Sequence, residues 1–269
     1  MKLRAYLSIA AVALLVACAT TTRPGAVGIN REQLLIVSAA EVEQMAAVSY
    51  AQQYNRAKSA GRLITDGPEF ERLKKIGGKL IRQSALFRDD TKQWKWNLTL
   101  IDASDLNASC APGGKITFYT GIIRQLTLTD DEIAAIMGHE IAHALREHGR
   151  EKVSEAMGQQ FVIALASANS KNPAQQTQLA NQVAQILFVL PNSREKETEA
   201  DKIGLELMAR AGYDPRAAVN VWRKMTTATR GQSPPEFLST HPAHATRINE
   251  LVALQPVVWP LYLSAPKPN

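Results

Sequence analysis

Two histidines separated by three residues carry the clearest chemical meaning in this sequence. They are His139 and His143, in the segment His-Glu-Ile-Ala-His at 139–143. On an α-helix, residues four apart share a face and lie about 6 Å apart along the axis, so both imidazoles can reach one ion. Two histidines, a carboxylate and an open water position are typical of catalytic zinc. Glu140, beside the first histidine, is placed to take a proton from the bound water.

An amphipathic helix with two incidental histidines is the alternative interpretation. The preceding residues favour the zinc interpretation, because Thr129 and Glu132 form a capping box that starts a helix. Ile133, Ile136 and Met137 then give this helix an apolar face that would bury the motif. We therefore predict a buried helix from the capping box to about residue 148, closed by Gly149.

A third zinc ligand must come from another element, and residues 195–201 offer an acidic cluster (Glu-Lys-Glu-Thr-Glu-Ala-Asp). Glu197 and Asp201 are four apart, so one carboxylate can bind zinc while the other orients a histidine. Spacing alone does not separate Glu197 from Glu195 and Glu199, and a solvated charged face is the alternative.

Two further residues near the motif have competing interpretations. His148 lies five residues beyond His143, so we expect it to point away from the metal and to interact with the helix C-terminal dipole. Cys110 is either a redox-sensitive thiol, a zinc ligand in a latent state, or a small residue packed in a loop.

Composition limits the possible classes of protein. The 269 residues include 45% hydrophobic and 21% charged side chains, enough for a sizeable core. The net charge of +6 is weak and dispersed, so we expect no nucleic acid partner. Two cysteines exclude a disulfide framework and a four-cysteine zinc module. No apolar run reaches the ~20 residues of a membrane-spanning helix.

The N-terminus predicts export and lipid anchoring. Residues 1–17 have a basic start and a short apolar stretch, typical of a signal peptide, with a buried helix as the alternative. Leu15-Val16-Ala17-Cys18 resembles a bacterial lipobox, so acyl chains on Cys18 would anchor the chain to a membrane. Ala19 favours the outer membrane, by resemblance to enterobacterial lipoproteins. Residues 18–34 are then the lipidated cysteine and a tether.

The remaining elements are predicted from periodicity and caps. A large domain is expected over 35–254, followed by an irregular, proline-rich tail over 255–269. Helices are expected over 39–58, from Pro68, in an Ala/Gln-rich stretch that ends at Pro191, over 194–211, after Pro215, and from Thr240 to about 254. Strands are expected over 93–101 and Lys115–Thr120, the latter after a turn at 107–114.

The zinc motif and the segment Glu197-Thr-Glu-Ala-Asp201 together resemble the gluzincin peptidases of the CAAX prenyl protease, HtpX and Oma-type family. The resemblance covers roughly 35–254. Within the family, the lipobox and the lack of membrane helices make the chain most similar to outer-membrane lipoprotein members. The other matching motifs are Asn107-Ala108, Pro112-Gly113-Gly114, Ser193-Arg194, His241-Pro242 and Arg247-Ile248. Ser109 departs from the family, whose members often carry Phe there, which concerns the packing beside the cleft.

This resemblance implies a mainly α fold with a small β-sheet (α+β), a zincin domain with an active-site helix and an edge strand that pairs with substrate. We expect Lys115–Thr120 to be that strand. The resemblance makes Glu197 the third ligand and Asp201 the carboxylate behind a histidine ligand. It places His241 and Arg247 near the metal, where they would stabilise the tetrahedral intermediate. Alternatively, His241 occupies the fourth ligand position of zinc in a resting state of the enzyme, or it caps a helix.

We therefore expect a zinc-dependent endopeptidase with one Zn²⁺ per chain, lipid-anchored to the outer membrane and facing the periplasm. By resemblance, its substrates are extended, unfolded or misassembled envelope proteins, and the outer-membrane assembly machinery is an expected partner. A non-catalytic or chaperone-like zinc-binding lipoprotein is the rival, but binding alone would not need Glu140. A small-molecule metallohydrolase is a second rival, which an open edge strand beside the metal would disfavour.

Overall fold

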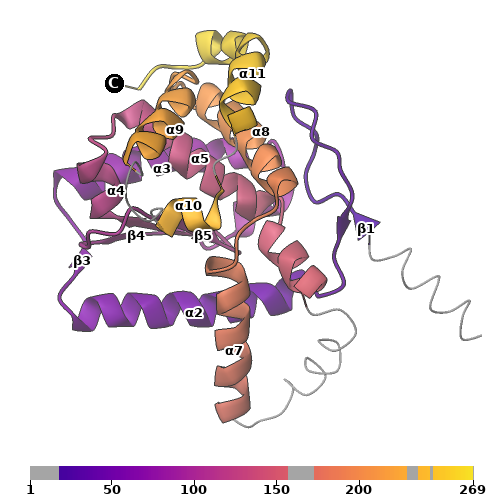
Figure 1. Ribbon diagram of the computed structural model, residues 1–269, viewed down its shortest axis with the longest axis vertical. Coiled ribbons are helices and arrows are strands. Elements are labelled where there is room, and N and C mark those ends of the chain that lie inside the picture. Colours follow the sequence, from indigo (N-terminus) through magenta and orange to yellow (C-terminus); the bar gives the residue numbers. More distant parts are fainter. Residues whose placement is uncertain (1–17, 157–172, 229–235, 243–244, 269) are drawn as a thin grey trace, which may run out of the picture.

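The computed structural model describes residues 18–156, 173–228, 236–242 and 245–268. The predicted signal peptide and His244 lie outside these residues. Within them, a four-stranded sheet lies between helix α2 on one face and a layer of helices on the other (Figure 1). The predicted mainly α fold with a small sheet is confirmed.

The first two long helices begin where the sequence predicts. Helix α2 (Ala39–Ser59) starts at a capping box in which the Ser38 hydroxyl accepts from the Glu41 backbone N–H. Helix α3 (Pro68–Ser84) starts with proline at its first turn. Its buried apolar residues pack against helix α5 (Asp130–Leu145). The other described elements are η1 (Asp89–Gln93), α4 (Thr120–Gln125), α7 (Pro173–Phe188), α9 (Ala217–Ala228) and α10 (Glu236–Thr240).

The sheet has the order β3-β4-β6-β5, which corrects one prediction. Strand β6 (Lys115–Tyr119) is central, between the parallel β4 (Asn97–Ile101) and the antiparallel β5 (Ala108–Ala111). The expected edge strand at Lys115–Thr120 is therefore wrong, and β5 and β3 (Leu63–Ile64) form the edges. The residues read as a turn form β5 because Gly113 and Gly114, at φ +75° and +81°, make a tight hairpin that returns β6 beside it.

Two helices cross at very short distance in the centre of the helical layer. They are α5 (Asp130–Leu145), which starts at the predicted Thr129 capping box, and α8 (Arg194–Arg210), which is capped by Ser193. Glycine occupies both sides of the crossing. A Cβ on Gly138 would lie 2.9 Å from the Gly204 carbonyl oxygen, and a Cβ on Gly204 would lie 2.7 Å from the His139 backbone nitrogen. Only glycines allow the backbones to approach this closely.

Helix α5 ends three residues earlier than predicted. Its last residue is Leu145, and Glu147 adopts a left-handed φ of 50° before helical residues resume at 148–156. Gly149 is therefore not the cap of this helix. The break changes the direction of the chain at His148, with consequences for the site.

The predicted tether, residues 18–34, packs against the domain instead (the right side of Figure 1). Strand β1 (Cys18–Ala19) pairs with β2 (Gln33–Leu34), and Ile29 and Thr22 are buried. Small and polar residues predict a flexible tether, but here their polar groups bond to buried charges of the domain.

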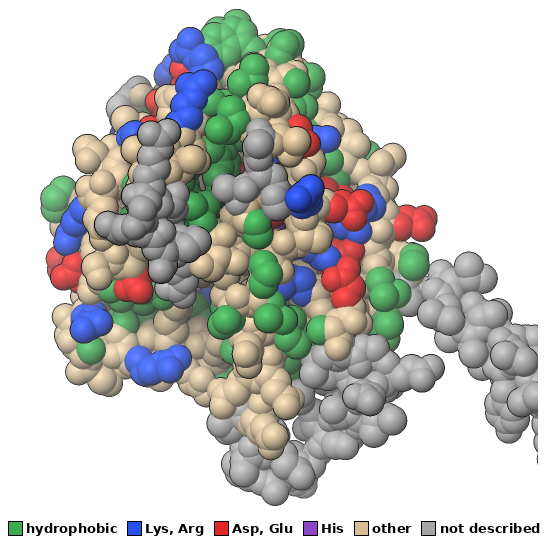
Figure 2. Space-filling view, in the orientation of Figure 1, with side chains coloured by type: hydrophobic (Ala, Val, Ile, Leu, Met, Phe, Trp, Pro, Cys, Tyr) green, Lys and Arg blue, Asp and Glu red, His purple; other side chains and the backbone are tan. Residues whose placement is uncertain are grey.

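The predicted irregular tail is also wrong up to Ser264, because α11 runs over Ala245–Ser264 with Pro256 and Pro260 inside it. Each proline removes a backbone hydrogen bond, yet Leu251 and Val258 of this helix are fully buried, and packing outweighs the local cost. Apolar side chains also gather on the outer surface at this end of the molecule (top of Figure 2). None of the helices in the described ranges has the length and apolar character needed to cross a membrane.

Gly204→Ala should lower the thermal stability of the metal-free protein. Helix propensity favours alanine by about 1 kcal/mol, but a Cβ 2.7 Å from backbone atoms forces α5 and α8 apart, and overpacking costs about 1–3 kcal/mol. Gly78→Ala in α3 is the control, because its Cβ would meet only the Arg82 guanidinium at 3.9 Å. Melting curves should show a lower Tm for the first variant and an equal or higher Tm for the second. Equal Tm values for Gly204→Ala and the wild type would contradict the close crossing.

Candidate metal centre

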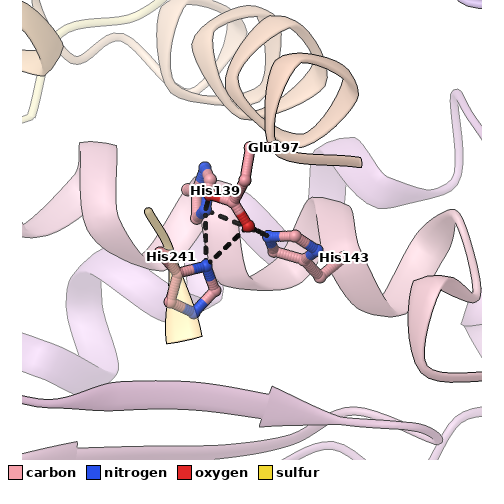
Figure 3. A group of neighbouring side chains, drawn as sticks. All are labelled: His139, His143, Glu197 and His241. Atoms are coloured by element: carbon pink, nitrogen blue, oxygen red, sulfur yellow. Dashed lines mark hydrogen bonds and ion pairs between the residues drawn. The ribbon is translucent and has the colours of Figure 1, made fainter. Parts of the chain in front are cut away.

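Four buried side chains from three parts of the chain converge above the sheet (Figure 3). His139 and His143 extend from α5, Glu197 from α8, and His241 from the residue after α10. One nitrogen or oxygen atom from each lies within 4.8 Å of all the others. The structure thus brings together His139, His143, Glu197 and His241, all of which the sequence analysis proposed.

The distances within this cluster are those of ligand atoms facing a common point. The Nε2 atoms of His139 and His143 are 3.0 Å apart, and His241 Nδ1 is 3.2 Å from His139 Nε2. Glu197 Oε1 lies 3.0 Å from His241 Nδ1 and 3.3 Å from His143 Nε2. Burial opposes the charge of Glu197, but the neighbouring histidines outweigh it and hold its pKa well below the usual range.

The donor set fits a zinc ion. Imidazole nitrogens and one carboxylate are the ligands that zinc prefers, and all four side chains are buried. Beside them, Glu140 Oε1 is a buried oxygen without a hydrogen-bond partner among the described residues, 3.5 Å from His241 Nε2. Burial raises the pKa of Glu140 above its ordinary value. A carboxylate oxygen without a hydrogen bond at this place fits a group that acts on a molecule entering the site.

A buried ion pair holds one histidine from behind. Asp201 Oδ1 lies 3.0 Å from His139 Nδ1, and Arg247 donates to both Asp201 oxygens at 2.7 Å. Burial would raise the pKa of Asp201, but Arg247 lowers it below its usual value. Arg247 also pairs with Glu197 Oε2 at 2.7 Å and lies 3.7 Å from the centre of the Trp222 ring. Its guanidinium is therefore directed at the two carboxylates.

Asn192 is a site residue that the sequence analysis missed. Its Nδ2 donates to Glu197 Oε1 at 2.8 Å, and its backbone N–H donates to the Thr240 carbonyl at 2.9 Å. Asn192 thus joins the start of α8 to the segment that carries His241. The only sign of this in the sequence is that Asn192 directly precedes Ser193, the cap of the helix that carries Glu197.

The structure separates the three alternating glutamates. Glu197 enters the cluster, whereas the Glu195 side chain is 65% exposed. Glu199 points to His148, whose Nε2 lies 3.0 Å away. The predicted role of His148 as a dipole partner pointing away is wrong, because its Nδ1 lies 2.8 Å from His143 Nδ1. The early end of α5 is the physical reason, since the turn at Glu147 directs His148 back toward the helix.

A cleft of about 570 Å³ opens in front of the cluster. Glu140, His143 and His241 lie at one side of it, with the edge strand β5 and helix α2 along its length. Cys110 of β5 also lines it, but its thiol is buried, and burial together with the Glu140 carboxylate raises its pKa. A protonated, buried thiol favours the packed interpretation of Cys110 over the redox-sensitive one.

The profile of peptidase family M48 matches residues 68–255. The chain belongs to peptidase family M48. This assignment and the histidine–glutamate cluster confirm the prediction of a metallopeptidase.

Several curated proteins are similar to part of the chain. The mitochondrial metalloendopeptidase OMA1 of Schizosaccharomyces pombe is 36% identical over 159 residues, 58% of this chain and 46% of the relative. The mitochondrial metalloendopeptidase OMA1 of Homo sapiens is 34% identical over 174 residues, covering 61% and 33%. The beta-barrel assembly-enhancing protease of Escherichia coli strain K12 is 25% identical over 204 residues, covering 71% and 40%. The chain thus matches less than half the length of each.

These relatives correct the predicted location. Relatives from yeasts, a plant and animals, at 31–36% identity, carry mitochondrial names. The prediction of an outer-membrane location facing the periplasm is therefore wrong on this comparison. It depended on a lipobox and on Ala19, which are short signals outside the residues that match the family.

Proposed function

We propose that this chain is a zinc-dependent endopeptidase that cleaves extended segments of unfolded or misassembled proteins. The observation that carries the proposal is the buried cluster of His139, His143 and Glu197 beside Glu140, whose Oε1 has no hydrogen-bond partner among the described residues. His139, His143 and Glu197 would hold the ion. Zinc bound there supplies a Lewis acid for the scissile carbonyl and lowers the pKa of a water.

The chain's own groups provide proton transfer and orientation. Glu140 takes the proton of the attacking water and passes it to the leaving amine, a role that its raised pKa supports. Asp201 fixes the His139 ring through Nδ1. Arg247 was expected to face the oxyanion, but its contacts support a different role, that of holding Asp201 and Glu197 in place.

An extended peptide is the substrate class that the cleft supports. Strand β5 (Ala108–Ala111) is an edge strand along the cleft, so its outer side can pair with a peptide backbone. This open edge also disfavours a small-molecule metallohydrolase. A non-catalytic or chaperone-like protein would have no use for the buried Glu140. Lipid attachment at Cys18, which is exposed and free, stays a prediction.

Glu197→Gln should weaken zinc binding more than ~100-fold, since even partners behind a ligand contribute 10–100-fold. Glu195→Gln is the matched control, because its side chain lies on the same helix but is 65% exposed and contacts Arg31 at 3.4 Å instead of the cluster. Competition with a chromogenic chelator measures both affinities. Weaker binding in the Glu195 variant, with the Glu197 variant unchanged, would refute the assignment of the third ligand.

Glu140→Gln should bind zinc like the wild type and cleave casein at least ~100-fold more slowly, because the amide cannot accept a proton. Zinc content by mass spectrometry of metals and release of casein fragments are the two measurements. Chelation of the wild type should abolish cleavage and added zinc should restore it. If the variant loses its zinc together with its activity, Glu140 is a structural or ligating residue and the proposed base is wrong.

His241 is proposed to hold the fourth ligand position at rest and to move away before substrate binds, since its Nδ1 points into the cluster. His241→Ala should then weaken zinc binding and raise the kcat for a short peptide. Steady-state kinetics and zinc affinity test this. A ~100-fold fall in kcat with an unchanged KM would show instead that His241 stabilises the oxyanion. Unchanged kinetics would leave only the helix-cap interpretation.

A further inference from the structure

A chain of buried polar contacts leads from the back of His143 to the N-terminal segment, residues 18–34. Its first link is the 2.8 Å contact between His143 Nδ1 and His148 Nδ1. Since His143 Nε2 faces the cluster, Nδ1 carries the proton of the neutral ring and donates a hydrogen bond to His148 Nδ1. His148 then carries its own proton on Nε2, which faces Glu199 Oε2 at 3.0 Å. Each contact thus fixes the tautomer of the next ring.

Glu199 connects this series of polar contacts to two arginines. Its Oε2 accepts from Arg146 Nε at 3.0 Å, and its Oε1 accepts from Arg31 Nε at 2.7 Å. Burial opposes the charge on Glu199, but His148 and the arginines outweigh it and lower its pKa to about 2. Glu199 is therefore a carboxylate acceptor for His148.

Arg31 belongs to the N-terminal segment and lies among three carboxylates, the third being the largely exposed Glu195, whose Oε1 is 3.4 Å from Arg31 Nε. Besides Glu199, it donates to both oxygens of Glu151, at 2.6 and 3.0 Å. Gln33 adds hydrogen bonds to Glu151 Oε2 at 3.0 Å and to the Arg146 carbonyl at 2.6 Å. Arg146 is fully buried and donates in return to the Arg31 carbonyl at 3.0 Å. The segment and the domain therefore share one charged network.

We propose that Arg31 is a positioning residue of the metal site, which acts through Glu199 and His148 on the ring of His143. The N-terminal segment is on this view a component of the metal centre. The two histidines of the motif are then held in parallel ways, His139 by Asp201 with Arg247 and His143 by His148 with Glu199. Groups that orient a histidine ligand contribute about 10–100-fold to metal affinity. This inference rests on the proposed zinc site, but not on the proposed peptidase activity.

The test is the zinc affinity of the full chain, measured by competition with a chelator. Arg31→Gln should bind zinc about 10-fold more weakly, and His148→Phe about 10–100-fold more weakly. Arg31→Lys keeps the charge but cannot reach two carboxylates in the same way, so it should fall between Arg31→Gln and the wild type. Arg23→Gln is the matched control, because Arg23 lies on the same segment but pairs with Asp89 at the surface, and its zinc affinity should match the wild type.

The double variant Arg31→Gln/His148→Phe distinguishes positioning from general weakening. If Arg31 acts through His148, the double variant should bind zinc as His148→Phe does, because the second change removes a link that is already broken. The absorption bands of the Co²⁺-substituted protein should change in both single variants and not in Arg23→Gln.

Two results would overturn the proposal. The first is that Arg31→Gln binds zinc with the same affinity as Arg23→Gln. The second is that the fold-loss of zinc affinity in the double variant equals the product of the losses in the two single variants. A wild-type chain that binds zinc but cleaves no peptide would refute the proposed function alone. A wild-type chain that binds no zinc would refute both.

Discussion

The contact on which the rest of the site depends is the crossing of α5 and α8 at Gly138 and Gly204. A Cβ on either residue would lie within 3 Å of the opposite backbone, so the two helices meet without side chains between them. His139 follows the first glycine directly, and Glu197 and Asp201 lie up to two turns before the second. At ordinary helix separations of 8–10 Å, the acidic side chains would have to extend further to reach the histidines. The short approach lets one carboxylate enter the cluster and another lie against a histidine ring.

The crossing also buries several carboxylates, and their negative charges explain the arginines around it. Glu140, Glu197, Glu199 and Asp201 are all buried, and a buried charged carboxylate costs free energy unless it is paired. Arg247 forms ion pairs with Glu197 and Asp201 on one side of α8. Arg146 and Arg31 form ion pairs with Glu199 on the other side. Glu140 pairs with no arginine among the described residues; its Oε1 lies 3.5 Å from His241 Nε2, and burial raises its pKa. Each arginine comes from a different part of the chain, so the charge balance of the site requires the whole fold.

Features set by local sequence were predicted, whereas features set by distant contacts were not. The starts of α2 and α5, the placement of His139 and His143 on one face and the end of α8 within a residue of the predicted 211 depend on neighbouring residues. The choice of Glu197 over Glu195 as a zinc ligand came only from family resemblance, because helical spacing alone does not distinguish the two residues. The edge position of β5, the packed N-terminal segment and the helical tail escaped prediction for one reason. Strand order and the burial of small or proline-rich segments are decided by tertiary packing, which can overrule local propensity.

The misread direction of His148 shows how the site uses a local conformation that costs free energy. Glu147 adopts φ 50°, a left-handed conformation that costs a residue other than glycine about 1–2 kcal/mol. Its carboxylate pairs with Arg88 and Arg150, each at 2.7 Å, which holds the turn against α5 and the next helix. Had α5 continued straight, residue 148 would lie about 140° around the helix from His143, turned away from its ring. The break instead places His148 behind His143, where its neutral ring accepts a hydrogen bond from His143 and donates one to Glu199. Strain at Glu147 is therefore coupled to the orientation of the His143 ring, and the ion pairs that hold the turn help to position that ring in the cluster.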